Sequence, residues 1–191
     1  MTTKLPRLGL GLLLTVLAAC ASFGDSGVDG GVEPGTIERR ELGSARNVTV
    51  LGDLTMSGQP AAEDLELAAK RGVTRVINIR TTPELERLGW DEGARCAELG
   101  LEYVHLPFRG DTATDEVYDG LIQLLDMPAP DAGGTLFHCA SGNRTAMIVA
   151  LLRMQRDGVA YDAALADAQA AGMKPSSLAP LEAQATRLGL R

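Results

Sequence analysis

Apolar residues in this chain form short strand-like runs that alternate with longer segments of helical periodicity. The strand-like runs are rich in β-branched residues and fall at residues 47–51, 73–79, 101–106 and 135–138. The helical segments are expected at residues 61–71, 83–99, 115–127, 145–154, 161–171 and 176–188. Because strands and helices alternate, the pattern predicts an α/β domain with a central, mainly parallel sheet flanked by helices.

The segment that begins at Thr145 is apolar on nearly every face, which predicts a helix buried against the sheet. It follows the strand at 135–138 after a short loop. A loop in this position lies at the carboxyl end of a strand, where open α/β sheets bind ligands. The chemistry of the chain is therefore expected at residues 138–145.

The first residues have the pattern of a secretory signal. Lys4 and Arg7 precede an apolar run at residues 8–19, which is too short to span a membrane. The run ends in Leu-Ala-Ala before Cys20, which resembles a bacterial lipobox. This resemblance implies a signal peptide at 1–19 and a lipid on Cys20 that anchors the chain to a membrane. Ala21 after that cysteine favours the periplasmic face of the outer membrane.

The rest of the chain divides into a tether and one domain. Residues 20–45 are rich in Gly, Asp, Ser and Glu, without apolar periodicity, and predict a flexible tether. Residues 46–191 suffice for one domain with an ordinary core. The formal charge of −7, without basic clusters, argues against nucleic acid as a partner.

Two residue types limit the chemistry further. The chain holds two histidines, and their spacing is not that of a metal site, so no metal is expected. Cys96 lies on a predicted helix and is interpreted as a small buried residue. The alternative, in an oxidising compartment, is a redox partner for Cys139.

The loop itself combines a thiol with groups that bind anions. Cys139 follows the strand, Gly142 permits a tight turn, and Arg144 offers two parallel hydrogen bonds to an oxyanion. Thr145 can cap the new helix or donate to the sulfur. Loop amides and a helix N-terminus favour the thiolate form of a cysteine. His138 precedes the thiol on the strand, so its side chain should point to the opposite face.

These residues carry a family resemblance. His138-Cys139-x-x-Gly142-x-Arg144-Thr145 resembles the signature loop of cysteine-dependent tyrosine and dual-specificity phosphatases. The loop is one residue shorter, C-x4-R instead of C-x5-R, as in the beta-lactamase-hydrolase-like phosphatase family. The segments 56–60, 72–80 and 101–107 are also similar to that family, and the resemblance covers about residues 47–157.

The resemblance implies a cysteine-phosphatase-like fold and hydrolysis of phosphate monoesters, protein phosphotyrosine among them, through a cysteinyl-phosphate. Cys139 is then the nucleophile, Arg144 the phosphate clamp and His138 a support of the loop. Asp111, which lies 28 residues before Cys139, is the expected general acid, with Asp115 as the fallback. The phosphate would be held by Ala140, Ser141, Gly142, Asn143 and Thr145, with Arg80 as a further anion ligand. No metal or organic cofactor is implied.

Two other functions remain open at this stage. A Cys-x-x-Gly-x-Arg-Thr loop also resembles rhodanese sulfurtransferases, in which the thiolate carries a persulfide. The segment 77–80, Ile-Asn-Ile-Arg, lacks the motifs that normally accompany that loop, which favours the phosphatase. The third function is a non-catalytic anion-binding module whose shortened loop no longer supports turnover.

Overall fold

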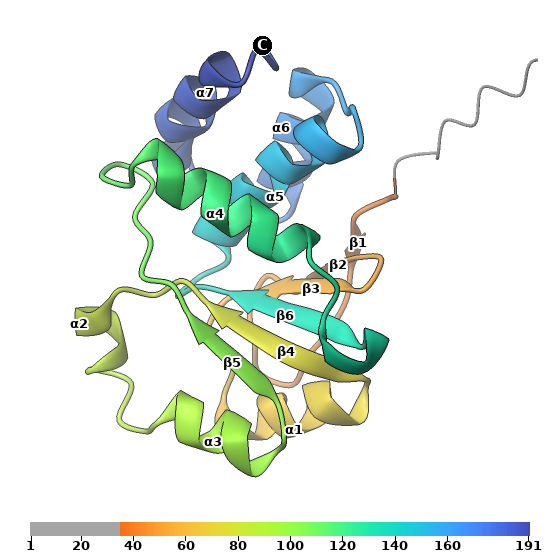
Figure 1. Ribbon diagram of the computed structural model, residues 1–191, viewed down its shortest axis with the longest axis vertical. Coiled ribbons are helices and arrows are strands. Elements are labelled where there is room, and N and C mark those ends of the chain that lie inside the picture. The colour runs from red at the N-terminus through yellow and green to blue at the C-terminus, as the bar shows by residue number, and fades with distance from the viewer. Residues whose placement is uncertain (1–34) are drawn as a thin grey trace, which may run out of the picture. The chain divides into compact units, whose positions relative to one another are not determined.

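The computed structural model describes residues 35–191. The expected signal peptide, Cys20 and the first part of the expected tether lie outside these residues. The sheet has the strand order β1-β2-β3-β6-β4-β5 (Figure 1). Its strands are β1 (Glu38–Arg39), β2 (Thr49–Leu51), β3 (Leu54–Ser57), β4 (Val73–Asn78), β5 (Glu102–His105) and β6 (Gly134–His138). The pairs β3–β6, β6–β4 and β4–β5 are parallel, so the α/β fold with a mainly parallel sheet is confirmed.

Helices cover both faces of the sheet (Figure 1). On one face lie α1 (Ala62–Lys70) and α3 (Glu92–Glu98). On the other lie α4 (Asp115–Asp126), α5 (Asn143–Arg156), α6 (Tyr161–Ala170) and α7 (Leu178–Arg187). The remaining helix, α2 (Thr82–Leu85), follows β4, and two short 3₁₀ turns occupy Pro130–Ala132 and Pro175–Ser177.

Two hydrophobic cores fill the spaces between these layers. The larger core packs α5 against residues such as Ile77 and Phe137, and the smaller packs α1 and α3 against residues such as Val76 and Leu136. Neighbouring residues of a strand thus enter opposite cores, as the period of two demands. α5 is buried from Thr145 to Met154, which confirms the helix expected from its all-round apolar sequence.

The domain begins earlier than residue 46. β1 pairs antiparallel with β2, and Leu42 is 3% exposed within the smaller core. The guanidinium of Arg71 donates to the carbonyl of Glu41 at 2.5 Å and so holds this segment against α1. The placement of residues 38–45 in a tether was therefore wrong, because one apolar side chain and a short edge strand suffice to dock a segment of polar composition.

Two further elements differ from expectation. The strand β3 was not predicted, since it follows β2 after a turn at Gly52 and Asp53 and is only four residues long. The helix expected at 83–99, with interruptions at Gly89 and Gly93, is two helices, α2 and α3, separated by residues 86–91. Within residues 35–191, no helix combines the length and apolar character needed to cross a bilayer.

Candidate active site

The loop that carries Cys139 joins β6, in the middle of the sheet, to the N-terminus of α5. Gly142 is the N-cap of α5 and has φ +86°, a left-handed conformation that favours glycine. A Cβ atom there would also lie 3.0 Å from the Cβ of Asn47. The tight turn expected at Gly142 is therefore present, and both backbone and neighbours require glycine.

Three carbonyl groups of this loop are hydrogen-bonded to neighbouring residues. The carbonyl of Ala140 accepts from the amide of Gln59 at 3.3 Å, and that of Ser141 accepts from Nδ2 of Asn47 at 2.7 Å. The carbonyl of Gly142 accepts from the hydroxyl of Thr145 at 2.8 Å. The amide of Gly142 points to the sulfur of Cys139, and we expect the other loop amides to face the same side, as in an anion-binding loop.

Cys139 sits at the base of this loop. Its Sγ accepts a hydrogen bond from the amide of Gly142 at 3.2 Å. The residue is 1% exposed, so a reacting group has to enter the loop to reach the sulfur. Thr145, which was expected to cap the helix or donate to the sulfur, donates instead to the carbonyl of Gly142.

The segment at 56–60 supports the loop from the side. Gly58 pairs with Ser141 in an isolated antiparallel bridge. A Cβ atom at Gly58 would lie 3.2 Å from the Cα of Ser141 and 3.3 Å from the oxygen of Ala140, so the close approach of the two backbones depends on glycine. Asn143 anchors the other side, since its Oδ1 accepts from the amide of Lys174 at 2.6 Å.

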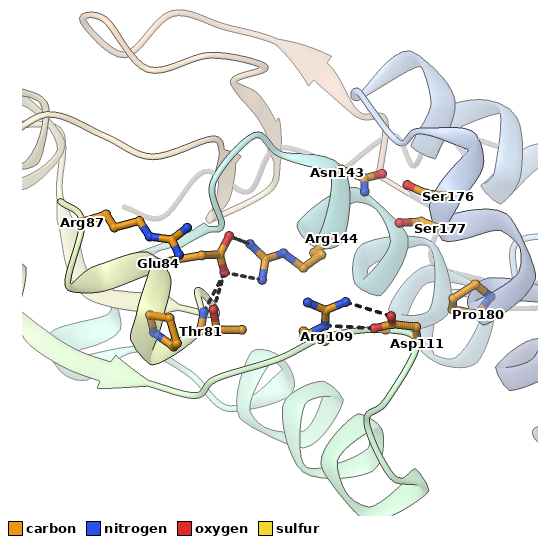
Figure 2. Close-up of a pocket in the computed structure, with 12 residues that line it drawn as sticks. Thr81, Glu84, Arg87, Arg109, Asp111, Asn143, Arg144, Ser176, Ser177 and Pro180 are labelled. Atoms are coloured by element: carbon orange, nitrogen blue, oxygen red, sulfur yellow. Dashed lines mark hydrogen bonds and ion pairs between the residues drawn. The ribbon is translucent and has the colours of Figure 1, made fainter.

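Arg144 is held by acceptors from three segments. Its guanidinium binds both carboxylate oxygens of Glu84, at 2.7 and 3.0 Å (Figure 2). It also donates to the carbonyl of Phe108 at 2.9 Å and to that of Ile79 at 3.3 Å. Burial opposes ionisation of Glu84, but hydrogen bonds from Arg144 and Thr81 outweigh it and lower the pKa of Glu84 to about 2. The carboxylate therefore stays ionised at neutral pH and fixes the orientation of the guanidinium.

Asp111 and Arg144 line the same pocket, which has a volume of about 570 Å³ (Figure 2). Asp111 is exposed, and its carboxylate receives two hydrogen bonds from Arg109, at 2.9 and 3.2 Å. These hydrogen bonds lower the pKa of Asp111 below its usual range. The loop that carries it is anchored where the hydroxyl of Tyr118 donates to the carbonyl of Gly110 at 2.8 Å.

Asp115 is placed differently. It begins α4, and its Oδ1 accepts from Nε2 of Gln184 at 2.9 Å and lies 3.3 Å from Nε of Arg187. It does not line the pocket beside Arg144. Of the two carboxylates considered as general acid, only Asp111 shares a pocket with Arg144.

Arg80 also lies away from the pocket lining. Its guanidinium donates to Oε1 of Gln59 at 2.6 Å and to the carbonyl of Glu84 at 2.6 Å. In this structure Arg80 therefore ties α2 to the segment beside the thiol loop. Its expected contact with a substrate anion stays a prediction.

His138 lies on the face of the sheet opposite to Cys139. Cys139 belongs to the larger core, whereas His138 faces α3, and its Nε2 lies 3.0 Å from Oε1 of Glu92. Both side chains are fully buried, at 0% and 2% exposure. The pair is close, although neither ring nitrogen makes a well-directed hydrogen bond with the described residues. His138 is thus buried behind the loop, and its expected support of the loop stays a prediction.

Glu92 is the centre of a buried polar cluster that the sequence did not indicate. Its carboxylate accepts from the side-chain amide of Asn78, from Nε2 of Gln59 at 3.2 Å and from the hydroxyl of Tyr103 at 3.5 Å. Burial and the charge of Glu92 raise the pKa of Tyr103. We call Glu92, His138, Gln59, Asn78 and Tyr103 the Glu92 cluster. Through Gln59 it connects the thiol loop with Arg80.

Cys96 lies on α3 in the smaller core and is 0% exposed, as expected for a small buried residue. Burial and the neighbouring Glu92 raise the pKa of its thiol to about 12. Cys96 and Cys139 are free thiols on opposite faces of the sheet. Within residues 35–191, no three His, Cys, Asp or Glu side chains are grouped so as to hold a metal ion.

A buried cysteine at the carboxyl end of a central strand, a tight loop with a glycine amide on the sulfur, and an arginine held by a carboxylate are typical of a cysteine-phosphatase-like domain. Residues 46–156, more than half of the chain, match the family described as "Beta-lactamase hydrolase-like protein, phosphatase-like domain". The chain belongs to this family, which confirms the resemblance drawn from the loop.

Curated relatives agree with this family. A beta-lactamase hydrolase-like protein of Xylella fastidiosa strain 9a5c is 33% identical over 121 residues, which are 60% of this chain and 27% of that protein. The protein of the same description from strain Temecula1 is 34% identical over 113 residues, or 56% of this chain and 26% of the relative. The chain thus spans only about a quarter of the length of these relatives.

Solved structures share the fold. Pseudomonas aeruginosa TpbA has a TM-score of 0.65 at 22% identity, covering 83% of this chain and 95% of TpbA. Tk-PTP in its active form has a TM-score of 0.63 at 18% identity, covering 77% of this chain and 99% of Tk-PTP. TpbA has also been solved in complex with pTyr, with a TM-score of 0.63 at 21% identity, covering 78% and 88% of the two chains.

Proposed function

We propose that this chain hydrolyses phosphate monoesters through a covalent cysteinyl-phosphate on Cys139. The observation that carries the proposal is the buried thiol at the base of a tight strand-to-helix loop, with its Sγ 3.2 Å from the amide of Gly142. The pTyr complex of TpbA supports a phosphorylated substrate, with protein phosphotyrosine among the candidates. Membership of the phosphatase-like family favours this chemistry over sulfur transfer.

The mechanism has two steps. The thiolate of Cys139 attacks phosphorus, an S–P bond forms, and the P–O bond to the leaving group breaks. Loop amides and Arg144 bind the equatorial oxygens, on which negative charge is concentrated. In the second step water attacks phosphorus while the general acid of the first step, now ionised, accepts a proton from that water; the S–P bond breaks, and inorganic phosphate and the thiolate are released. Glu84 contributes by holding Arg144 in one orientation.

We assign the general acid to Asp111, which has to be protonated to donate to the leaving oxygen. Since the hydrogen bonds from Arg109 lower the pKa of Asp111, the acid form requires that this pair separate during the reaction. An acid that must be protonated makes kcat/KM fall as the pH rises through its pKa.

Asp111→Asn should therefore abolish this high-pH limb and lower kcat by about 10²–10⁴-fold. Arg109→Met should move the limb to higher pH, because removal of the guanidinium lets the pKa of Asp111 rise. The measurement is the pH profile of kcat/KM, with Asp115→Asn as the matched control. A high-pH limb that survives in Asp111→Asn but disappears in Asp115→Asn would transfer the role to Asp115.

The function itself is tested by turnover of p-nitrophenyl phosphate under reducing conditions. Release of nitrophenol by the wild-type protein is the expected result. A protein that binds phosphate without turnover would be an anion-binding module, and a stable persulfide on Cys139 would mark a sulfurtransferase.

We further propose that the chain is a lipoprotein anchored through Cys20 to the periplasmic face of the outer membrane. The support is the basic and apolar sequence that precedes Cys20, together with Ala21 after it. Radioactive palmitate should label the wild-type protein and fail to label Cys20→Ser, with Cys96→Ser as the control that keeps the label. Equal labelling of wild type and Cys20→Ser would refute the anchor.

A further inference from the structure

The pocket beside the thiol loop is lined by three guanidinium groups, those of Arg87, Arg109 and Arg144 (Figure 2). Two of them are occupied by carboxylates of the same pocket. Glu84 binds Arg144 at 2.7 Å, and Asp111 binds Arg109 at 2.9 Å. Arg87 is exposed and makes no ion pair or hydrogen bond with the described residues. While the Arg144–Glu84 and Arg109–Asp111 pairs are intact, its charge is the one in this lining that is available to a ligand beyond the reacting phosphate.

The charge of the pocket is opposite to that of the chain. Three guanidiniums against the two carboxylates of Glu84 and Asp111 leave one net positive charge in the lining. The whole chain has a formal charge of −7. A local positive potential on an acidic protein attracts small anions to this place and disfavours binding elsewhere on the surface.

The rest of the lining is better suited to hydrogen bonds than to burial of an aromatic ring of a ligand. Hydroxyls come from Thr81, Ser176 and Ser177, and an amide comes from Asn143. The only apolar members are Pro83 and Pro180, and no aromatic side chain is present in the lining. Pockets that recognise rings are usually lined by apolar and aromatic side chains. The lining instead suits a compact polar ligand with more than one anionic group.

The pocket is also large enough for a second group. Its volume of about 570 Å³ falls within the ~300–1,000 Å³ typical of small-molecule sites. Glu84 stands between Arg87 and Arg144, so the two guanidiniums lie on different sides of one carboxylate (Figure 2). Part of the wall, Ser176, Ser177 and Pro180, comes from residues beyond the family match at 46–156. This wall therefore belongs to the part of the pocket that the family match does not define.

We propose that this pocket selects phosphate esters that carry a second anionic group, bound by Arg87 while the ester phosphate lies in the Cys139 loop. The proposal rests on the proposed phosphatase function, because that function places the first phosphate. Diphosphates, bisphosphates and phosphorylated carboxylic acids belong to this class. A single guanidinium forms charge-assisted hydrogen bonds with any of these second groups.

The test is calorimetric titration of inorganic phosphate and of pyrophosphate into the full-length Cys139→Ser protein. This protein lacks the nucleophile, so no turnover should occur, and the buffer is free of metal ions that would bind pyrophosphate. Pyrophosphate supplies the second anionic group without any other chemistry. We expect it to bind about tenfold more tightly than phosphate. In the same background, Arg87→Met should bring the two affinities to within about twofold. Lys70→Met, which removes one exposed charge on α1 outside this pocket, should preserve the tenfold preference.

Each other outcome has a distinct meaning. A preference that persists unchanged in Arg87→Met would overturn the role of Arg87. Equal affinities in the parent protein would overturn the second subsite but leave the phosphatase proposal standing. Binding of neither anion, in a protein shown by circular dichroism to be folded, would overturn the subsite together with the phosphate loop on which it rests.

Discussion

Cys139→Ser should lower the turnover of p-nitrophenyl phosphate by about 10⁴-fold or more. The hydroxyl of serine is not ionised at neutral pH, and a single amide contact at 3.2 Å from Gly142 is too little to ionise it. Because Sγ lies 1% exposed in the larger core and the exchange of sulfur for oxygen is nearly isosteric, the fold should persist. Steady-state kinetics and thermal unfolding of the same preparation measure both effects.

Cys96→Ser is the matched control for this substitution. Cys96 is equally buried but lies on α3, on the opposite face of the sheet from the loop. This variant should retain turnover within a few-fold of the wild type. Loss of turnover in Cys96→Ser together with full turnover in Cys139→Ser would show that Cys139 is not the nucleophile and would contradict the mechanism.

Glu92→Ala should lower the free energy of unfolding by about 3–5 kcal/mol. The carboxylate is 2% exposed and receives hydrogen bonds from Asn78, Gln59 and Tyr103 beside the imidazole of His138. Its removal leaves several buried polar groups without their acceptor, and each such group costs about 1–3 kcal/mol. Since domains of this size are stable by about 5–15 kcal/mol, urea unfolding should show a much lower midpoint.

Glu98→Ala is the control on the same helix. Glu98 is exposed and pairs only with Arg95, so its removal should change stability by about 1 kcal/mol or less. Glu92→Gln keeps the shape of the side chain but replaces one acceptor oxygen by an NH2 donor. Its loss of stability should fall between those of Glu92→Ala and Glu98→Ala. Equal unfolding midpoints for Glu92→Ala and Glu98→Ala would show that the Glu92 cluster does not stabilise the domain.

The parts of the site that were predictable lie close together in the sequence. Cys139, Gly142 and Arg144 fall within one strand-loop-helix unit, and a turn followed by a buried helix restricts how such a unit can fold. The orientation of His138 followed from the period of two along β6. The local geometry of the loop could therefore be predicted from the sequence, and the family match agrees with it.

The partners of these residues were not predictable, because the sheet brings them from distant segments. Glu84 precedes Arg144 by 60 positions, and Gln59 precedes Glu92 by 33. On their own helices, Glu84 and Glu92 resemble ordinary acidic residues of a first turn, which usually face solvent. Arg80 shows the same limit, since its position at the end of β4 did not indicate that it would bind Gln59.

Direct detection of the cysteinyl-phosphate tests the central claim most sharply. The Asp111→Asn protein, in which release of the phosphoryl group should be slow, is mixed with p-nitrophenyl phosphate, quenched within milliseconds and digested for mass spectrometry. The account predicts phosphate on the peptide that contains Cys139 and none on the peptide that contains Cys96. Steady turnover by the wild type with no phosphorylated Cys139 peptide in the variant, or a persulfide in its place, would contradict it.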